Sequence, residues 1–251
     1  MPRPATLITG ASAGLGAEFA RQCAARGEEL VLVARRTDRL EALAAELGRA
    51  HVVTADLADP DVPARVVARA RALDLWVDKL INNAGFGLVG RFDALPAERQ
   101  SEMIDLNVRA LTGLCFLVIG DMLAHGRGAI LNVASTAAFQ PGPYFAVYFA
   151  TKAYVLSFTE ALHQELKGSG IKVSALCPGP TATEFGGVAG FASARFDLFA
   201  AEAGGVVRAG LAGLDANRAV IVPGFLNKAA AQSGRLLPRA LMRRIVSRLK
   251  S

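Results

Sequence analysis

Cysteine is scarce in this sequence. Its three cysteines, Cys23, Cys115 and Cys177, lie far apart in apolar segments. Their spacing matches no metal-binding motif, and an odd number of thiols cannot all pair with one another. The sequence therefore predicts no metal site and no disulfide framework, and small buried thiols of this kind favour a reducing compartment.

Long apolar runs and a leader peptide are also missing. No uninterrupted apolar stretch reaches about 18 residues, the length that spans a bilayer. The first residues enter a strand without the charged and then apolar segments of a secretion signal. We therefore expect a cytoplasmic protein.

Acidic residues are absent from residues 235–251, which hold six basic ones. The net charge of the chain is +6 and its pI is about 9.6, so this tail accounts for the whole excess and the rest is formally neutral. A nucleic-acid partner is therefore not expected. Residues 226–251 predict a basic amphipathic helical segment. Its apolar side is formed by Leu237, Leu241, Met242, Ile245, Val246 and Leu249. The opposite side is formed mainly by Arg239, Arg243, Arg244 and Lys250. This segment could bind an anionic membrane surface, but packing against the body or another subunit is the favoured alternative.

The remaining composition indicates one large core. The chain has 251 residues, 52% of them hydrophobic, and contains neither a linker nor an internal repeat. Apolar strands alternate with helical segments along the chain, which predicts a parallel sheet with helices on both faces. We therefore expect a single α/β domain over 1–251 with a Rossmann-type, doubly wound, three-layer architecture. Its seven strands are predicted at 5–9, 29–34, 51–55, 79–82, 129–134, 171–176 and 218–222.

The first predicted strand runs into a glycine-rich loop, TGASAGLG, and then into a helix. This order suits a phosphate-binding loop, because glycines let the backbone approach a pyrophosphate and the helix N-terminus offers free N–H groups. The spacing differs from the common Gly-x-Gly-x-x-Gly fingerprint, and an ordinary tight turn is the alternative. The candidate cofactor ligands here are Gly10, Ser12, Ala13, Gly14, Leu15 and Gly16.

Two arginines, Arg35 and Arg36, follow the second predicted strand, where an NAD site usually has an acidic residue. Arginine at this point accommodates the 2′-phosphate of NADP, so the sequence favours NADP over NAD. Two solvated surface arginines are the alternative. Asp56 and Leu57 follow the third strand, where an adenine ring could lie, although Asp56 could equally cap the next turn.

Polar and small residues follow the fourth strand in the sequence NNAGFG. Asn83, Ala84 and Gly85 are candidate contacts for a flat ligand, and a structural turn is the alternative. A long helix is then predicted over 98–125. It carries Asn107 among apolar neighbours, where a buried amide must be hydrogen-bonded.

A serine, a tyrosine and a lysine stand close together between residues 129 and 152. Tyr148 and Lys152 are four residues apart, so a helix beginning near Val147 places both on one face. Ser135 ends an apolar strand, and ligands of open α/β sheets lie beyond the carboxyl ends of the strands. These three side chains are therefore predicted to share one cleft.

The sixth strand ends in CPGPTATEF, a sharp turn that presents Pro178, Gly179, Thr181 and Thr183. The glycine- and phenylalanine-rich residues 186–215 suit a lid over an apolar substrate site, and a pair of capping helices is the alternative. The apolar side chains that could line this site are Phe86, Val89, Phe139, Tyr144, Phe185 and Phe191.

In these features the chain resembles the short-chain dehydrogenase/reductase family over essentially its whole length. The resemblance is carried by Thr9 to Gly16, Asp56-Leu57, Asn82 to Gly85, Asn107, Ser135, Tyr148, Lys152 and Pro178-Gly179. It implies NADP-dependent hydride transfer between the nicotinamide and a carbonyl or secondary alcohol, by a homodimer or homotetramer. Ala13 departs from the basic residue that many NADP-dependent members have in the loop, so the preference for NADP depends on Arg35 and Arg36.

The family also implies a catalytic tetrad of Asn107, Ser135, Tyr148 and Lys152. Tyr148 would be the general acid, with a pKa well below the usual value of about 10 because of the adjacent Lys152 ammonium. Lys152 would also hold the nicotinamide ribose, Ser135 would bind the substrate oxygen, and Asn107 would hold a water. Thr183 would contact the carboxamide. A cofactor-binding scaffold or sensor without turnover is the alternative function.

Overall fold

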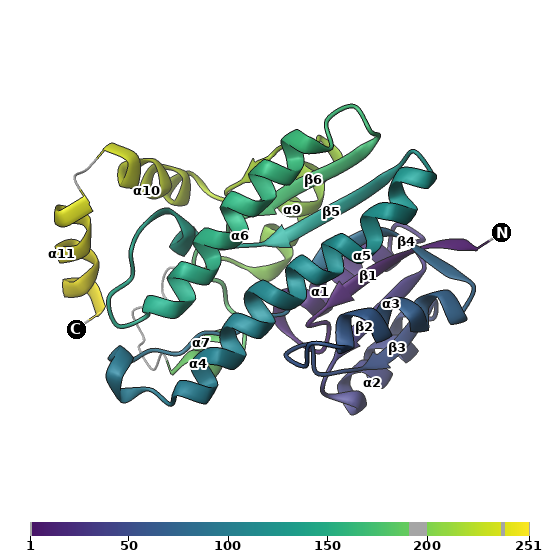
Figure 1. The fold of residues 1–251 in the computed structure, drawn as a ribbon, viewed down its shortest axis with the longest axis horizontal. Helices are drawn as coiled ribbons and strands as arrows, with labels where there is room; N and C mark the ends of the chain where they lie inside the picture. Colours follow the sequence, from purple (N-terminus) through teal and green to yellow (C-terminus); the bar gives the residue numbers. More distant parts are fainter. Residues whose placement is uncertain (1, 191–199, 237–238, 251) are drawn as a thin grey trace.

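The computed structural model describes residues 2–190, 200–236 and 239–250. Its core is a seven-stranded sheet in the order β3-β2-β1-β4-β5-β6-β7, in which every pair of neighbours is parallel (Figure 1). The predicted Rossmann-type fold is therefore confirmed. The strands are β1 (Arg3–Thr9), β2 (Leu30–Ala34), β3 (Ala50–Thr54), β4 (Leu75–Asn82), β5 (Gly128–Val133), β6 (Ile171–Leu176) and β7 (Val220–Ile221).

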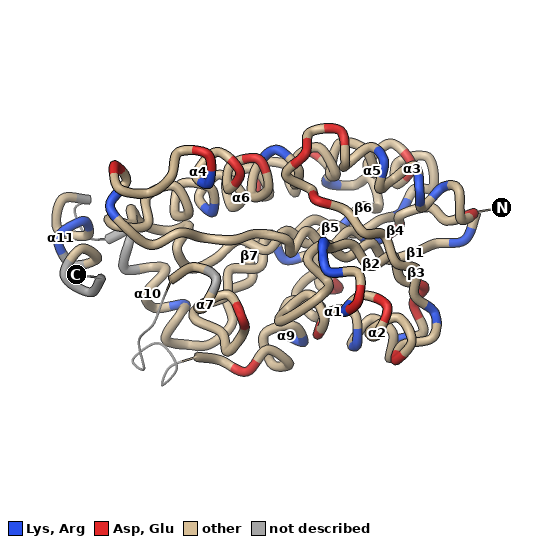
Figure 2. Tube along the Cα trace, turned by 90° about the horizontal axis from the view of Figure 1, so that it is seen from below, with Lys and Arg blue, Asp and Glu red and all other residues tan. Residues whose placement is uncertain are grey.

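Helices cover both faces of the sheet, as the view along its plane shows (Figure 2). One layer contains α3 (Val62–Ala72), α5 (Leu111–Ala124) and α6 (Ala146–Glu165), and their apolar sides share one core with the strands. The opposite layer contains α1 (Gly14–Ala24), α2 (Thr37–Leu47) and α9 (Ala203–Asp215), which bury a second core. This three-layer arrangement leaves the carboxyl ends of the strands as the place for a site.

Strand β2 shows why the strands read as continuous apolar runs. All five of its residues are buried, and Val31 and Val33 face one core while Leu30 and Leu32 face the other. Successive side chains of a strand point to opposite faces, so a sheet covered on both sides needs apolar residues at every position.

Strand β4 begins four residues before its prediction, because Asp78 and Lys79 interrupt its apolar pattern. Lys79 is accommodated by the Glu28 carboxylate at 2.5 Å. At the other end of β4, Asn82 lies directly opposite Asn132 of β5, and both amides are buried. Asn82 Nδ2 donates to Asn132 Oδ1 at 2.9 Å, and Asn132 Nδ2 donates to the Thr159 hydroxyl of α6 at 3.0 Å.

The long helix predicted over 98–125 is interrupted. It consists of α4 (Ala97–Ile104), a π-helical turn η2 (Asp105–Ala110) and α5. The wider π turn changes the direction in which the side chains of α5 point, and such turns are frequent at functional sites. Among the described residues, the continuous helical stretch 97–124 formed by α4, η2 and α5 is long and apolar enough to cross a membrane, judged by length and composition alone. Core helices pass the same test, and α5 buries Leu114, Val118 and Met122 in the core.

The described residues of the predicted lid segment, 186–215, divide between the site and the core. Among the described residues of this segment, only α7 (Phe185–Ala189) lies beside the apolar cluster of the site, whereas α9 buries Val206, Val207 and Leu211 against the sheet. The prediction of a lid reaching residue 215 is therefore wrong for α9, because small and apolar residues suit a sheet-covering helix equally well. Residues 191–199 lie outside the described part of the chain.

The basic tail forms α10 (Phe225–Leu236) and α11 (Arg239–Lys250), which extend at one end of the molecule (Figure 1). Helix α10 packs against the short helix η3 (Thr136–Phe139). In α11, Met242 and Val246 are buried and Arg243 and Arg244 are exposed. The predicted amphipathic helix is thus present, and Met242 and Val246 of its apolar side pack within the protein, whereas Leu241 of the same side is 43% exposed.

Candidate active site

Tyr148 and Lys152 lie one turn apart near the start of α6, and both side chains are buried. Lys152 Nζ donates a hydrogen bond of 2.8 Å to the carbonyl oxygen of Val133, at the end of β5. The same ammonium lies 5.8 Å from the centre of the Tyr148 ring. Helix α6 and strand β5 therefore bring the predicted tyrosine and lysine together.

Ser135 follows β5 and caps η3, where its hydroxyl oxygen accepts a hydrogen bond of 3.1 Å from the Ala137 N–H. The next residue, Thr136, donates its backbone N–H to the Pro178 carbonyl at 2.9 Å, which ties this turn to the loop after β6. Ser135 also hydrogen-bonds with Tyr148 and lowers the pKa of the phenol. The predicted serine, tyrosine and lysine are thus one cluster.

Burial nevertheless dominates the protonation of Tyr148. It raises the pKa of the phenol to about 12, and the Ser135 hydrogen bond only partly opposes this shift. Burial likewise lowers the pKa of Lys152 to about 8, while the nearby Cys177 acts in the opposite direction. The expected lowering of the Tyr148 pKa by Lys152 is therefore wrong for the protein by itself: a low-dielectric pocket disfavours the phenolate and holds the proton on the oxygen.

Asn107 lies in the π turn η2 and is almost fully buried. Its Oδ1 accepts from the Phe86 N–H at 3.1 Å, and its Nδ2 donates to the Phe86 carbonyl at 2.9 Å and to the Thr151 hydroxyl at 3.1 Å. A Cβ on Gly85 would lie 2.9 Å from Asn107 Oδ1 and 3.5 Å from Lys152 Nζ. Asn107 thus fixes the loop after β4 against α6, beside Lys152.

Aromatic side chains form the wall around Tyr148. The ring of Phe145 stacks on the Tyr148 ring, with 4.5 Å between the ring centres. The ring of Phe185, the first residue of α7, lies 5.4 Å from the Tyr148 ring. Phe86 and Val89 belong to the same apolar cluster. Of the other side chains predicted to line the pocket, Phe139 packs instead against the main core, Tyr144 is partly exposed with a φ of +61°, and Phe191 lies outside the described residues.

The glycine loop has the shape that a phosphate needs. Gly10 and Gly14 have positive φ values of +67° and +53°, which favour glycine. A Cβ on Gly16 would lie 2.1 Å from the Gly10 carbonyl oxygen, so no other residue fits there. Helix α1 begins at Gly14 after Ala13, without a side-chain cap or an acidic residue in its first turn. These features fit the pyrophosphate of a dinucleotide.

Asn83 and Thr9 hold the loop in place. Asn83 Nδ2 donates to the Thr9 carbonyl at 2.9 Å, and the Thr9 hydroxyl accepts from the backbone N–H groups of Asn83 and Ala84 at 3.0 and 2.9 Å. Asn83 therefore positions the glycine loop from the end of β4. The supporting role of Thr9 was missed, since a threonine ending a strand carries no distinctive signal.

The two arginines after β2 have different partners. Arg36 donates from Nε and Nη2 to the Ser12 hydroxyl at 3.2 and 3.1 Å, so it lies beside the glycine loop. Arg35 lies 3.6 Å from the Asp56 carboxylate, which also accepts from the Ala58 N–H at 3.1 Å. Asp56 thus caps its turn, as the alternative prediction held, and Leu57 is buried in the main core.

The loop after β6 lies against the glycine loop. A Cβ on Gly14 would lie 3.1 Å from the Thr183 side chain, and the Thr181 hydroxyl donates to the Gly179 carbonyl at 3.0 Å. Thr183 is therefore placed near the predicted pyrophosphate site, whereas Thr181 is engaged in its own turn. Two charged neighbours, Arg39 and Glu184, were not predicted.

Comparison with known proteins agrees with this geometry. A family model described as short chain dehydrogenase matches residues 4–189. Sulfoacetaldehyde reductase of Chromohalobacter salexigens is 40% identical over 184 residues, covering 71% of this chain and 72% of the relative. Serine 3-dehydrogenase of Agrobacterium fabrum is 34% identical over 181 residues, with the same shares covered. The chain belongs to the short-chain dehydrogenase/reductase family, whose members oxidise CH–OH groups or reduce carbonyls.

Solved structures show the same fold. A short-chain dehydrogenase from Sphingobium yanoikuyae in complex with NADPH has a TM-score of 0.82 at 38% identity, covering 95% of this chain and 94% of that one. A ketoacyl reductase from Brucella melitensis complexed with NADH has a TM-score of 0.80 at 30% identity, covering 88% and 96%. Both nicotinamide cofactors therefore occur among similar proteins.

Proposed function

We propose that this oxidoreductase uses NADPH to reduce a lipophilic ketone or aldehyde, or runs the reverse oxidation with NADP. The observation that carries the proposal is the cluster of Ser135 with the buried side chains of Tyr148 and Lys152, at the end of β5 and the start of α6. The cluster lies at the carboxyl edge of a sheet whose glycine loop fits a dinucleotide.

The residues divide the chemistry between them. When bound, the nicotinamide would supply or accept the hydride. Tyr148 donates its phenolic proton to the carbonyl oxygen, and the high pKa ensures that the proton is present. Ser135 hydrogen-bonds the same oxygen as negative charge develops on it. Lys152, held on the Val133 carbonyl, stabilises the phenolate that remains after the proton leaves.

The apolar wall supports a lipophilic substrate. Phe145, Phe185, Phe86 and Val89 surround Tyr148, so a hydrocarbon group beside the carbonyl would be removed from water. A structure titled as a bulky-bulky ketone specific alcohol dehydrogenase from Comamonas testosteroni is 32% identical with a TM-score of 0.78, covering 96% of this chain and 97% of that one. We favour this substrate class over a sulfonate such as sulfoacetaldehyde.

A substrate panel tests the proposal. Purified protein should oxidise NADPH at least about tenfold more efficiently than NADH, measured as kcat/KM with bulky ketones, aromatic aldehydes and sulfoacetaldehyde in parallel. Arg36→Ala should remove most of the preference for NADPH, because the residue lies beside the glycine loop. Turnover confined to sulfoacetaldehyde would contradict the substrate class. Cofactor binding without any turnover would instead support the scaffold or sensor.

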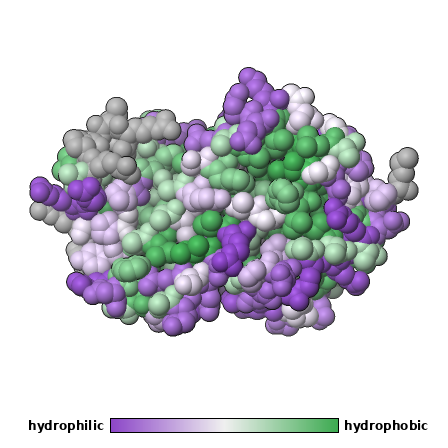
Figure 3. Space-filling model, in the orientation of Figure 1, coloured by the Kyte–Doolittle hydropathy of each residue, from purple (hydrophilic) through white to green (hydrophobic). Residues whose placement is uncertain are grey.

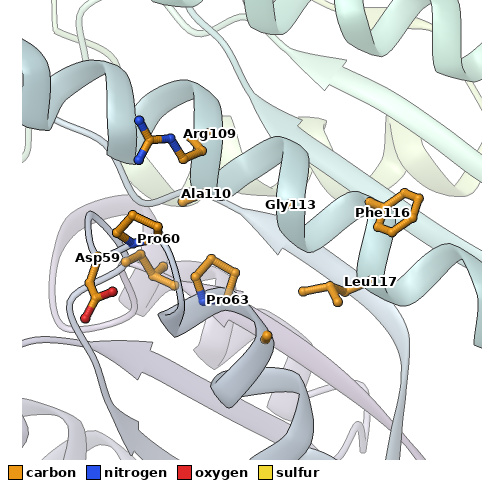
Figure 4. A pocket seen from close by; sticks show the side chains of 10 residues that line it. Asp59, Pro60, Pro63, Arg109, Ala110, Gly113, Phe116 and Leu117 are labelled. Atoms are coloured by element: carbon orange, nitrogen blue, oxygen red, sulfur yellow. The ribbon is translucent and has the colours of Figure 1, made fainter.

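A homo-oligomer is the second part of the proposal, supported by an apolar surface on α5. Phe116 is 81% exposed and Leu123 is 50% exposed, and Figure 3 shows apolar residues gathered over this helix. Beside Phe116 is a groove of about 240 Å³ between α5 and the start of α3, where Pro63, Gly113 and Leu117 form the wall (Figure 4). A two-fold axis would let the ring of one copy enter the groove of another.

Phe116→Glu should convert the oligomer into a monomer, because a charge would replace the ring at the centre of the contact. Light scattering after size-exclusion chromatography measures the mass directly. Phe92→Glu is the matched control, since this phenylalanine is also exposed but lies away from α5, before α4. If the wild type is monomeric, or if both variants keep its mass, the α5 surface is not the interface.

A further inference from the structure

The carboxylate of Glu184 connects the substrate side of the molecule to the nucleotide side. Glu184 directly precedes α7, yet its Oε2 accepts from Arg36 Nη1 at 2.8 Å and its Oε1 accepts from Arg39 Nη1 at 2.5 Å. The two arginines are 148 and 145 residues away in the sequence. Hydrogen bonds from Arg39 and Arg36 lower the pKa of Glu184, so the carboxylate is charged near neutral pH.

The position of Glu184 is unusual for an acid. Arg36 simultaneously donates from Nε and Nη2 to the Ser12 hydroxyl, within the loop that fits the pyrophosphate. The preceding residue, Thr183, lies against Gly14 of the same loop. A carboxylate here therefore stands where an anionic dinucleotide would have to approach, and repulsion from the phosphates would act against it.

A carboxylate and a phosphate present similar pairs of oxygens to a guanidinium. The Arg36 Nη1 and Arg39 Nη1 groups that a 2′-phosphate would use are already bonded to Glu184. All three side chains are about half exposed, so the contact is open to solvent. Exposed ion pairs of this kind are weak, and a phosphate with greater charge can displace the carboxylate.

We propose that Glu184 is an internal competitor for the cofactor's 2′-phosphate, which is held by Arg36 and by the unpredicted Arg39. This inference rests on the proposed use of NADPH. Binding of the 2′-phosphate releases Glu184 and with it α7, which lies against Tyr148 through Phe185. A cofactor without this phosphate leaves the ion pairs intact. Glu184 therefore limits NADPH affinity and links cofactor identity to the mobility of the substrate wall.

Calorimetric titration with 2′,5′-ADP and 5′-ADP tests the competition without any turnover. Glu184→Gln should bind 2′,5′-ADP about 3- to 30-fold more tightly than wild type, because two exposed ion pairs no longer oppose the phosphate. Binding of 5′-ADP should change less than about twofold. Glu202→Gln is the control. It removes the carboxylate of the residue that directly precedes α9, and it should change neither affinity. Equal or weaker 2′,5′-ADP binding by Glu184→Gln would overturn the inference.

Hydrogen exchange of residues 185–189 provides a second readout. In the wild type, 2′,5′-ADP should accelerate exchange in α7 while 5′-ADP should not, and Glu184→Gln should show the faster exchange from the start. If 2′,5′-ADP does not accelerate exchange in α7 beyond the rate seen with 5′-ADP, the proposed release of α7 is contradicted. Arg39→Ala should weaken 2′,5′-ADP binding. If the wild type turns over with NADPH but Glu184→Gln binds 2′,5′-ADP as the wild type does, only this inference is refuted. If the wild type turns over selectively with NADH, the proposed cofactor is refuted.

Discussion

Replacing Tyr148 with phenylalanine should lower kcat for carbonyl reduction by about 10²- to 10⁴-fold, the usual contribution of a positioned proton donor. The substitution removes only the hydroxyl that hydrogen-bonds with Ser135. The ring still stacks on Phe145 at 4.5 Å, so folding and cofactor binding should be preserved. Stopped-flow kinetics with saturating NADPH, together with thermal melting, measures both effects.

Tyr154→Phe is the matched control on the same helix. The Tyr154 hydroxyl is hydrogen-bonded to Thr112 at 3.0 Å, and the residue is 40% exposed, away from the Ser135 cluster. Its loss should leave kcat within about twofold of wild type, since surface contacts of this kind contribute little. Equal activity of Tyr148→Phe and Tyr154→Phe would show that Tyr148 is not the proton donor.

Replacing Gly16 with alanine should strongly weaken cofactor binding and reduce stability by about 1–3 kcal/mol. The added methyl group would lie 2.1 Å from the Gly10 carbonyl oxygen and 2.7 Å from the Asn83 amide nitrogen. The first of these atoms is backbone and cannot rotate away, so the loop itself must move. NADPH affinity, measured by fluorescence quenching or calorimetry, should fall by at least about 100-fold, or about 2.7 kcal/mol.

Gly205→Ala in α9 is the control for this second substitution. Within the described part of the chain, no atom outside the adjacent backbone of the same helix lies within 4 Å of the added methyl group, and the backbone there is helical. The variant should keep its NADPH affinity and gain about 0.5–1 kcal/mol of stability, because alanine is the better helix former. If Gly16→Ala binds NADPH as well as Gly205→Ala does, the loop after β1 is not the pyrophosphate site.

Much of the fold could be predicted because the pattern of apolar residues along a strand indicates whether one or both of its faces are buried. The five buried residues of β2 are apolar at every position, which only a sheet covered on both faces requires. Local patterns fail where tertiary contacts compensate. Lys79 of β4 is tolerated because Glu28 lies beside it. Similarly, glycine and alanine over 203–215 suit either a lid or a core helix, and only packing against the sheet distinguishes them.

The site could be predicted where it depends on spacing within one element. Tyr148 and Lys152 are four residues apart, so the start of α6 determines their common face. The Tyr148 pKa could not be predicted, since it depends on how many neighbours exclude water from the phenol. The Glu184–Arg39 pair was also missed, because it joins residues that the sequence separates by 145 positions.

The paired amides of Asn82 and Asn132 have a consequence for how the chain assembles. They face one another across β4 and β5, with Ile81 opposite Leu131 one step earlier. A slip of one residue in either direction would place Asn82 opposite an aliphatic side chain, Leu131 or Val133, and would separate the two amides that are now hydrogen-bonded. The two asparagines therefore favour the native alignment of β4 with β5 over a shifted one, because only the native alignment pairs their buried amides with each other.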